Sequence, residues 1–194
     1  MKELMPRMNS QKKVDGTLEY VVPRETIGVE LAKALSRNPQ RTVKELVGHG
    51  ALAELFPHVQ AIWESDPTYL HPLSQAMPGE LTVVLALLLR DLPLEEVRHN
   101  LSLTGLDTLT RGSSQRTEAQ IIIALIRLLN ENLDPEDIRT MRASEFEKRY
   151  FNGKGMLFIR CLELLQHHDW KHAIQARRTH IEQRWLVDHD ETIA

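Results

Sequence analysis

Apolar residues recur at helical spacing along most of this chain, and proline and glycine mark where one helix stops and the next starts. A first helix is predicted just after Pro23, because apolar residues follow it at steps of three and four: Ile27, Leu31, Ala34 and Leu35. Asn38-Pro39 then has the form of an N-cap followed by proline at the first helical position, which predicts that a second helix begins there. Gly48 or Gly50 is expected to close it in the left-handed conformation.

The apolar pattern beyond residue 57 predicts a loop-rich connector and then a series of further helices. Pro67, Pro72 and Pro78 divide residues 58–78 into short pieces, so this stretch is expected to be the connector. Residues 81–89 are apolar almost all round, which is typical of a helix that is buried on several sides. Further helices are expected over residues 93–103, 118–130, 156–165 and 169–187, after Asp134-Pro135, and at Ser144, where Glu147 would complete a capping box.

These elements predict an all-α fold, an irregular array of about seven to ten short helices. Residues 1–22 precede them as a lead-in, in which the polar stretch from Lys12 to Gly16 predicts a turn before an extended segment. No run of about 18 apolar residues suggests a membrane span. Cys161, the single cysteine, lies in an apolar helical pattern and is expected to be buried, in a reducing and therefore cytoplasmic compartment.

Charge is unevenly distributed although the net charge is only −3. Basic residues exceed acidic ones in residues 1–50 and 139–184, whereas residues 51–138 hold five Lys or Arg against thirteen Asp or Glu. Such a chain has the means to contact phosphates through its two basic segments. The alternative, ordinary solvated helix faces, explains the same counts, and only clustering in space would make a nucleic-acid footprint.

The stretch from residue 23 to residue 57 resembles the neck-to-body junction of the class II tRNA nucleotidyltransferases, the family of CCA-adding enzymes and bacterial poly(A) polymerases. The family segment Glu-Arg-Ile-x-x-Glu-Leu-x-Lys is followed there by two short helices that end in Gly-x-Leu-x-x-Leu-Phe-Pro. The matching residues here are Glu25, Ile27, Glu30, Leu31 and Lys33, then Gly50, Leu52, Leu55, Phe56 and Pro57. Thr26 stands where the family has arginine.

The resemblance implies the neck and body of such an enzyme, divided into a lead-in (1–22), neck-to-body helices (23–66) and a helical body (67–194). A body of this kind binds and positions tRNA or other structured RNA, while a catalytic head, which this chain lacks, transfers the nucleotide. We therefore expect no catalytic residues, no metal site and no cofactor in this chain, and no membrane partner. Mg²⁺ with ATP or CTP is expected only for a full-length parent enzyme, whose head is a possible separate partner.

The candidate RNA-binding residues are basic side chains near the two ends: Lys33, Arg37, Arg41, Lys44, Lys171, Arg177 and Arg178. Lys33 and Arg37 are four apart and so share one side of the first helix, and Arg41 and Lys44 share one side of the second. Arginine guanidinium groups suit bidentate phosphate contacts, which read shape and backbone and carry no base-specific code. If the last helix packs beside the first two, all seven residues would form one surface.

Two other functions stay open beside RNA binding. One is a helical scaffold that docks a protein partner. The other is a degenerate His-Asp phosphohydrolase, but Arg90-Asp91 occupies the place of the His-Asp pair, and an arginine has no free lone pair for a metal.

His168 and His172 could share a metal on one helix face, although two ligands do not complete a structural zinc site. Asn152-Gly153-Lys154-Gly155 lacks the spacing of a phosphate-binding loop and is expected to break a helix.

Overall fold

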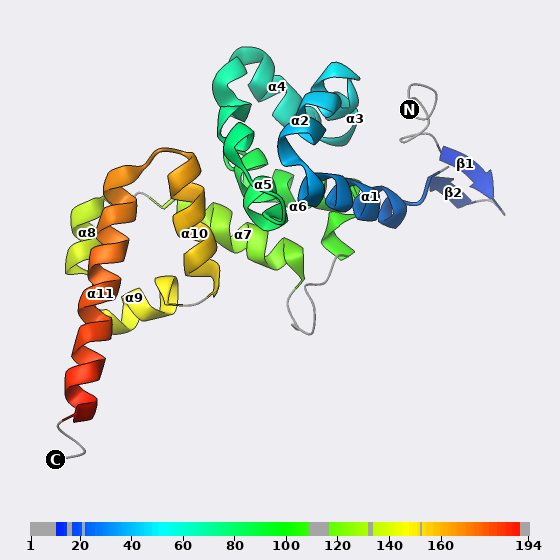
Figure 1. The fold of residues 1–194 in the computed structure, drawn as a ribbon. Coiled ribbons are helices and arrows are strands. Elements are labelled where there is room, and N and C mark those ends of the chain that lie inside the picture. The colour runs from blue at the N-terminus through cyan, green and yellow to red at the C-terminus, as the bar shows by residue number, and fades with distance from the viewer. Residues whose placement is uncertain are drawn as a thin grey trace. The chain divides into compact units, whose positions relative to one another are not determined.

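The chain is almost entirely helical where its structure is described, which confirms the predicted all-α class and its irregular helix packing. The computed structural model describes residues 11–14, 17–20, 22–108, 117–131, 134–151 and 153–190, without the side chains of residues 18–20, 108 and 185–190. Two compact units make up the chain, Met1–Ile126 and Arg127–Ala194 (Figure 1). This division follows from how the residues pack. The predicted boundaries after residues 22 and 66 came from the resemblance to tRNA nucleotidyltransferases, and they stay predictions.

The residues before the first helix form a small antiparallel hairpin. Strand β1 (Gln11–Val14) pairs with β2 (Thr17–Tyr20), and Val14 lies opposite Thr17. Lys12 and Lys13, which we expected in the turn, belong to β1. Asp15 and Gly16, which we also expected in the turn, lie outside the described residues.

The first two helices form where the sequence predicts them. Helix α1 (Arg24–Arg37) follows Pro23 directly and buries Ile27, Leu31 and Leu35, while Ala34 is only half-buried. Helix α2 (Pro39–Gly48) has proline at its first position. The Asn38 side chain accepts a hydrogen bond from the backbone N–H of Arg41 at 3.0 Å, which satisfies one of the free donors at the helix start.

Helix α3 (Ala51–Leu55) follows a glycine turn, and the next segment corrects a prediction. Gly50 has φ +71° and is the glycine that adopts the left-handed conformation. Residues 58–78, expected to be mainly loop, instead form most of helix α4 (Pro57–Ser65) and a 3-10 helix, η2 (Pro67–Gln75). The prolines misled the prediction because Pro67 stands at the first position of η2, where a missing N–H costs nothing, and Pro72 lies inside η2.

The predicted buried helix is the centre of the first unit. Helix α5 (Leu81–Leu88) is buried on every side: each residue from Val83 to Leu88 is at most 1% exposed. Tyr69 of η2 anchors against it, since its hydroxyl donates to the backbone carbonyl of Leu88 at 3.0 Å. Burial raises the pKa of Tyr69 to about 12, so this hydroxyl keeps its proton and stays a donor at neutral pH.

Two further helices and a 3-10 turn complete the first unit. Helix α6 (Leu94–Leu103) begins after Pro93 and ends before Gly105, which has φ +71°, as the sequence predicts. It leads into the 3-10 turn η3 (Leu106–Thr108), which packs against α1. Helix α7 (Glu118–Leu129) buries four isoleucine and leucine side chains at helical spacing, and the boundary between the units falls within its last turn.

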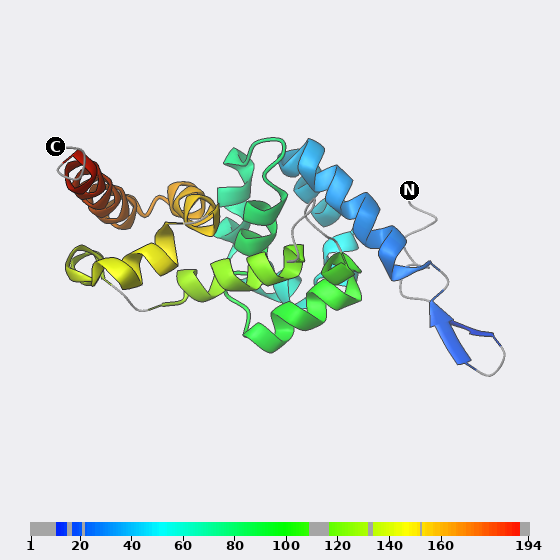
Figure 2. The same ribbon diagram turned by 90° about the horizontal axis from the view of Figure 1, so that it is seen from below.

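The second unit is built from four helices (Figures 1 and 2). They are α8 (Pro135–Thr140), α9 (Ala143–Tyr150), α10 (Gly153–Leu164) and α11 (His168–Asp190). Helix α11, drawn orange to red, packs along α8 and α10. The second unit has an aromatic core between α9 and α10, formed by Phe146, Tyr150 and Phe158. Cys161 of α10 is buried, as predicted.

Capping at the start of this unit differs from the prediction. The capping box lies at Asp134, whose carboxylate accepts from the N–H of Asp137 at 2.8 Å while the Asp137 side chain accepts from the N–H of Asp134. Ser144 is not a cap, because α9 already starts at Ala143. The helix break expected at Asn152-Gly153-Lys154-Gly155 is wrong for its last three residues, because α10 already begins at Gly153, and Asn152 lies outside the described residues.

Candidate nucleic-acid interface

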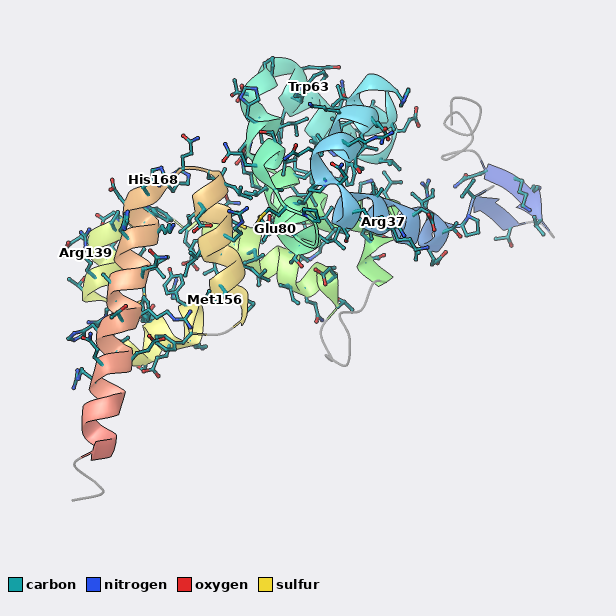
Figure 3. All side chains as sticks on the ribbon, in the orientation of Figure 1. Arg37, Trp63, Glu80, Arg139, Met156 and His168 are labelled. Carbon is teal, nitrogen blue, oxygen red and sulfur yellow. The ribbon has the colours of Figure 1, made fainter. Side chains whose placement is uncertain are left out.

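The predicted RNA-binding residues of α1 lie on the side of the helix that faces away from the core. The buried residues of α1 cluster on one stripe, and at 100° per residue Lys33 and Arg37 fall opposite it. Lys33 forms an ion pair with Glu30 at 2.7 Å, and both side chains are more than half exposed. Arg37, labelled in Figure 3, is exposed and makes no ion pair within the described part of the chain.

Helix α2 carries the next two cations. The Arg41 side chain is 76% exposed and pairs with Glu45 one helical turn away, at 2.8 Å. Lys44 is exposed on the flank of α2 and has no ion pair among the described residues. Exposed pairs of this kind contribute at most about 1 kcal/mol, so Lys33 and Arg41 can exchange their carboxylates for a phosphate at little cost.

The junction of α1 and α2 is held by hydrogen bonds as well as by the Asn38 cap. The hydroxyl of Thr42 in α2 donates to the carbonyl of Ala34 in α1 at 2.9 Å. The N–H of Gly79, which follows η2, donates to the carbonyl of Ser36 at 2.7 Å. The Thr42 bond holds α2 against α1, and the Gly79 bond holds the end of α1 to the segment after η2. Lys33, Arg37, Arg41 and Lys44 are thus all exposed on two helices that contact each other, and we call these four side chains the α1–α2 basic face.

The three C-terminal candidates lie in the other unit, and each is engaged within it. Lys171 of α11 pairs with Glu163 of α10 at 2.7 Å. Arg177 donates to the backbone carbonyl of Met141 at 2.9 Å. Arg178 pairs with Glu182 at 3.1 Å, and its guanidinium lies 4.9 Å from the centre of the Phe151 ring. These side chains therefore tie α11 to its neighbours, and the seven candidates divide into one group in each unit.

The electrostatics of Glu163 show how firmly Lys171 is held. The hydrogen bond from Lys171, and after it the one from Arg160, lower the pKa of the Glu163 carboxyl below its ordinary value. A carboxylate that two cations stabilise is ionised throughout the neutral range. Lys171 is accordingly less available to a phosphate than the exposed cations of the α1–α2 basic face, because binding would first require it to leave Glu163.

A cavity of about 320 Å³ adjoins the α1–α2 basic face within the first unit. Its walls come from α2, α4 and η2 and are mainly apolar, with polar groups among them. The lining residues are Gln40, Val43, Lys44, Val47, Gly48, Trp63, Pro67, Leu70, His71, Leu73 and Ser74. Sequence reasoning missed this site because it treated residues 58–78 as a connector. The available signal was Trp63, a large aromatic residue between two prolines that each open a helix.

A second cavity of about 350 Å³ lies between α1 and the end of α6. Arg24 and Glu25 line one side, and His99 and Asp107 are among the residues that line the other. Both signs of charge are present there, so this cavity shows no preference for a phosphate or for a cation. No sequence pattern predicted this cavity.

The residues weighed for metal chemistry have other roles where the structure describes them. Arg90 lies 3.8 Å above the Tyr69 ring and donates to the carbonyls of Leu87 and Tyr69, so it packs η2 against α5. His168 and His172 are exposed at the start of α11. No group of three or more His, Cys, Asp or Glu side chains is placed to hold a metal ion within the described residues.

The sequence also contains an Asp-x-Asp element, Asp188-His189-Asp190, of the kind that holds metal ions in nucleotidyltransferase heads. It lies in the last turn of α11, and its side chains are outside the described residues.

No helix within the described ranges is both long enough and apolar enough to span a membrane. No protein-family model, curated protein or solved structure matches the chain.

Proposed function

We propose that this chain binds structured RNA, with tRNA as its first candidate, through the α1–α2 basic face, and that it positions the RNA without transferring nucleotides itself. The observation that carries the proposal is the exposure of Lys33, Arg37, Arg41 and Lys44 on two helices whose junction is fixed by hydrogen bonds. The resemblance of residues 23–57 to the neck-to-body junction of tRNA nucleotidyltransferases supports the same function.

The chemistry of such binding is phosphate and shape recognition. Exposed lysine and arginine side chains neutralise phosphates and release the counterions that surround them. Two contacting helices spread four cations over a surface, which suits a duplex arm whose phosphates run past it. Backbone contacts of this kind carry no sequence information, so the affinity would be similar for RNAs of similar shape.

Under this proposal, the C-terminal cations can bind RNA only after they release their present contacts within the second unit. Lys171, Arg177 and Arg178 would have to give up contacts that hold α11, so their replacement would weaken the second unit as well as any RNA contact. Nucleotide transfer, if the RNA undergoes it, would come from a separate catalytic head. The alternative of a protein-docking scaffold stays open, since the cavity beside α2 is largely apolar.

The test is filter binding of tRNA over a range of salt concentrations, with Arg37→Gln/Lys44→Gln as the test variant. We expect weaker binding for every structured RNA tested. If both side chains contact phosphates, the slope of log K against log salt should fall by about two units, since each lost contact removes about one. The double variant Arg98→Gln/Arg139→Gln is the charge-matched control, because it removes the same two positive charges from exposed side chains outside α1 and α2.

Two results would contradict the proposal. One is the absence of tRNA binding by the unaltered chain at low salt. The other is an equal loss of affinity in the test variant and its control, which would mean that net charge alone, and no particular face, attracts the RNA. Circular dichroism of each variant establishes that the helices are intact.

A further inference from the structure

The cavity beside α2 has a floor and walls that other parts of the unit hold in place. Val43, Leu70 and Leu73 are buried beneath it. The start of η2 is fixed because the Asp66 carboxylate accepts from the N–H of Thr68 at 3.0 Å and from its hydroxyl at 2.6 Å. The Tyr69 hydroxyl bonds to α5 from the same element. The cavity is therefore a preformed feature, as small-molecule sites usually are.

Its lining combines an aromatic side chain, aliphatic surface and a cation. Trp63, half-buried in α4 and labelled in Figure 3, supplies a flat indole face. Lys44 stands in the same lining and is also a member of the α1–α2 basic face. Gln40, His71 and Ser74 add hydrogen-bonding groups. An aromatic platform next to a cation and a few polar groups is the combination with which proteins bind unpaired nucleotides.

We propose that this cavity takes one unpaired nucleobase of the bound RNA, stacked on Trp63, with the adjoining phosphate at Lys44. The proposal rests on the RNA-binding function above and adds a preference for RNA that has a single-stranded end or a flipped-out base next to its duplex. Stacking accepts any base because every base has an aromatic face, so little sequence preference is expected.

The size of the cavity favours a nucleobase over a segment of a protein partner. A volume of about 320 Å³ is at the lower end of ligand pockets, which suits a single ring system. A stable protein interface covers about 800 Å² on each partner, far more than one such cavity provides. Continuity also favours RNA, because Lys44 joins the cavity to the exposed cations of α1 and α2.

The experiment uses the full chain with Trp170→Phe/Trp185→Phe, which leaves Trp63 as its single tryptophan. It is titrated with two RNA hairpins that share one stem, one blunt and one with a four-nucleotide 3′ overhang. We expect the overhang to quench Trp63 fluorescence and to raise the affinity about tenfold, within the range measured for stacking one base. The blunt hairpin should bind without quenching.

Two substitutions test the cavity itself by filter binding. Trp63→Leu removes the indole and should abolish the tenfold preference while the affinity for the blunt hairpin stays the same. Val47→Phe keeps Trp63 and fills the cavity, and it should have the same effect. Because the blunt hairpin reports on the basic face alone, it also shows that each variant is folded and active.

Each remaining outcome decides against one or both proposals. Equal affinity for the two hairpins without quenching overturns the base-binding site and leaves RNA binding intact. Failure of both hairpins to bind overturns the proposed function as well. Quenching of Trp63 by an acidic amphipathic helical peptide, with none by the overhang, would assign the cavity to a protein partner and overturn the nucleobase proposal.

Discussion

At the scale of single residues, the partners of a charged side chain decide what it can do. Lys33 and Lys171 are both lysines on helix surfaces, and both pair with a glutamate at 2.7 Å. Lys33 pairs along its own helix and is 55% exposed, whereas Lys171 reaches from α11 to α10 and is 24% exposed. The first pair is a solvated contact of small value, and the second connects two elements of the fold.

Glu163 should make the stability of the second unit sensitive to acid. Its pKa is lowered in the folded chain, chiefly by Lys171, so the pair stabilises the fold at neutral pH. This contribution is lost as the pH falls from the ordinary glutamate value of 4.5 through the lowered one. We expect Glu163→Gln to reduce the free energy of unfolding at pH 7 and to change it little at pH 2. Urea unfolding in a Trp63→Phe/Trp185→Phe background, followed through Trp170 fluorescence, measures this.

Glu136→Gln is the control for that measurement. Glu136 also pairs with an arginine, Arg139 at 3.0 Å, but both side chains are more than half exposed. Its removal should change the stability by less than about 0.5 kcal/mol at either pH. An equal loss for Glu163→Gln at pH 7 and pH 2 would show that the glutamine disturbs packing instead of removing an ion pair.

At the scale of elements, close approach of backbones positions α1 against the end of α6. Gly28 is buried in the middle of α1, and a Cβ atom added there would lie 2.5 Å from the carbonyl oxygen of Gly105. Gly48 ends α2, and a Cβ there would meet nothing within 4 Å. The two glycines therefore have opposite roles: the first permits contact between elements, and the second costs helix stability without a packing benefit.

Alanine substitutions should separate these two roles. Gly28→Ala is expected to destabilise the first unit by about 1–3 kcal/mol, the usual cost of overpacking, because backbone atoms cannot move aside. Gly48→Ala is expected to stabilise it by up to about 1 kcal/mol, since alanine favours a helix. Urea unfolding followed through Trp63 fluorescence, in the Trp170→Phe/Trp185→Phe background, would measure both. Stabilisation by Gly28→Ala would mean that α1 does not approach Gly105 this closely.

At the scale of the whole molecule, the proposed RNA-binding surface lies in one unit, and the sequence motifs of the resembled catalytic head can be compared with it. The α1–α2 basic face and the cavity beside it belong to one unit. The glycine-rich phosphate element of the resembled enzymes does not occur in the sequence, and the single Asp-x-Asp element lies on a helix. Two carboxylates two residues apart on a helix are a poor pair for holding Mg²⁺.

We therefore predict that the chain alone does not extend RNA. Incubation with Mg²⁺, ATP, CTP and tRNA that lacks its 3′ end should leave the tRNA length unchanged on a denaturing gel. A complete CCA-adding enzyme that extends the same tRNA is the positive control. Extension activity that follows the purified chain through successive columns would contradict the prediction and would direct attention to Asp188 and Asp190.

The sequence by itself determined which segments are helices where the cause is local. The spacing of Ile27, Leu31 and Leu35 places α1, and the uniformly apolar run from Val83 to Leu89 places the buried α5. Asn38-Pro39 fixes the start of α2 through a bond that spans only three residues. The sequence was insufficient where one residue type fits two local structures. Prolines suggested a loop, but they open α4 and η2. Ser144 matched a capping pattern, but α9 begins one residue before it.

Only the tertiary structure decided which cations remain exposed, and that Trp63 and Lys44 line the same cavity. Arg177 contacts a carbonyl 36 residues earlier in the chain, and Arg178 contacts the ring of Phe151, so helical spacing could not predict either partner. The cavity at Trp63 likewise needs three elements to pack together. The physical reason is range: helix formation and capping depend on neighbours within about four residues, whereas burial, ion pairing between elements and cavities depend on side chains that are distant in sequence.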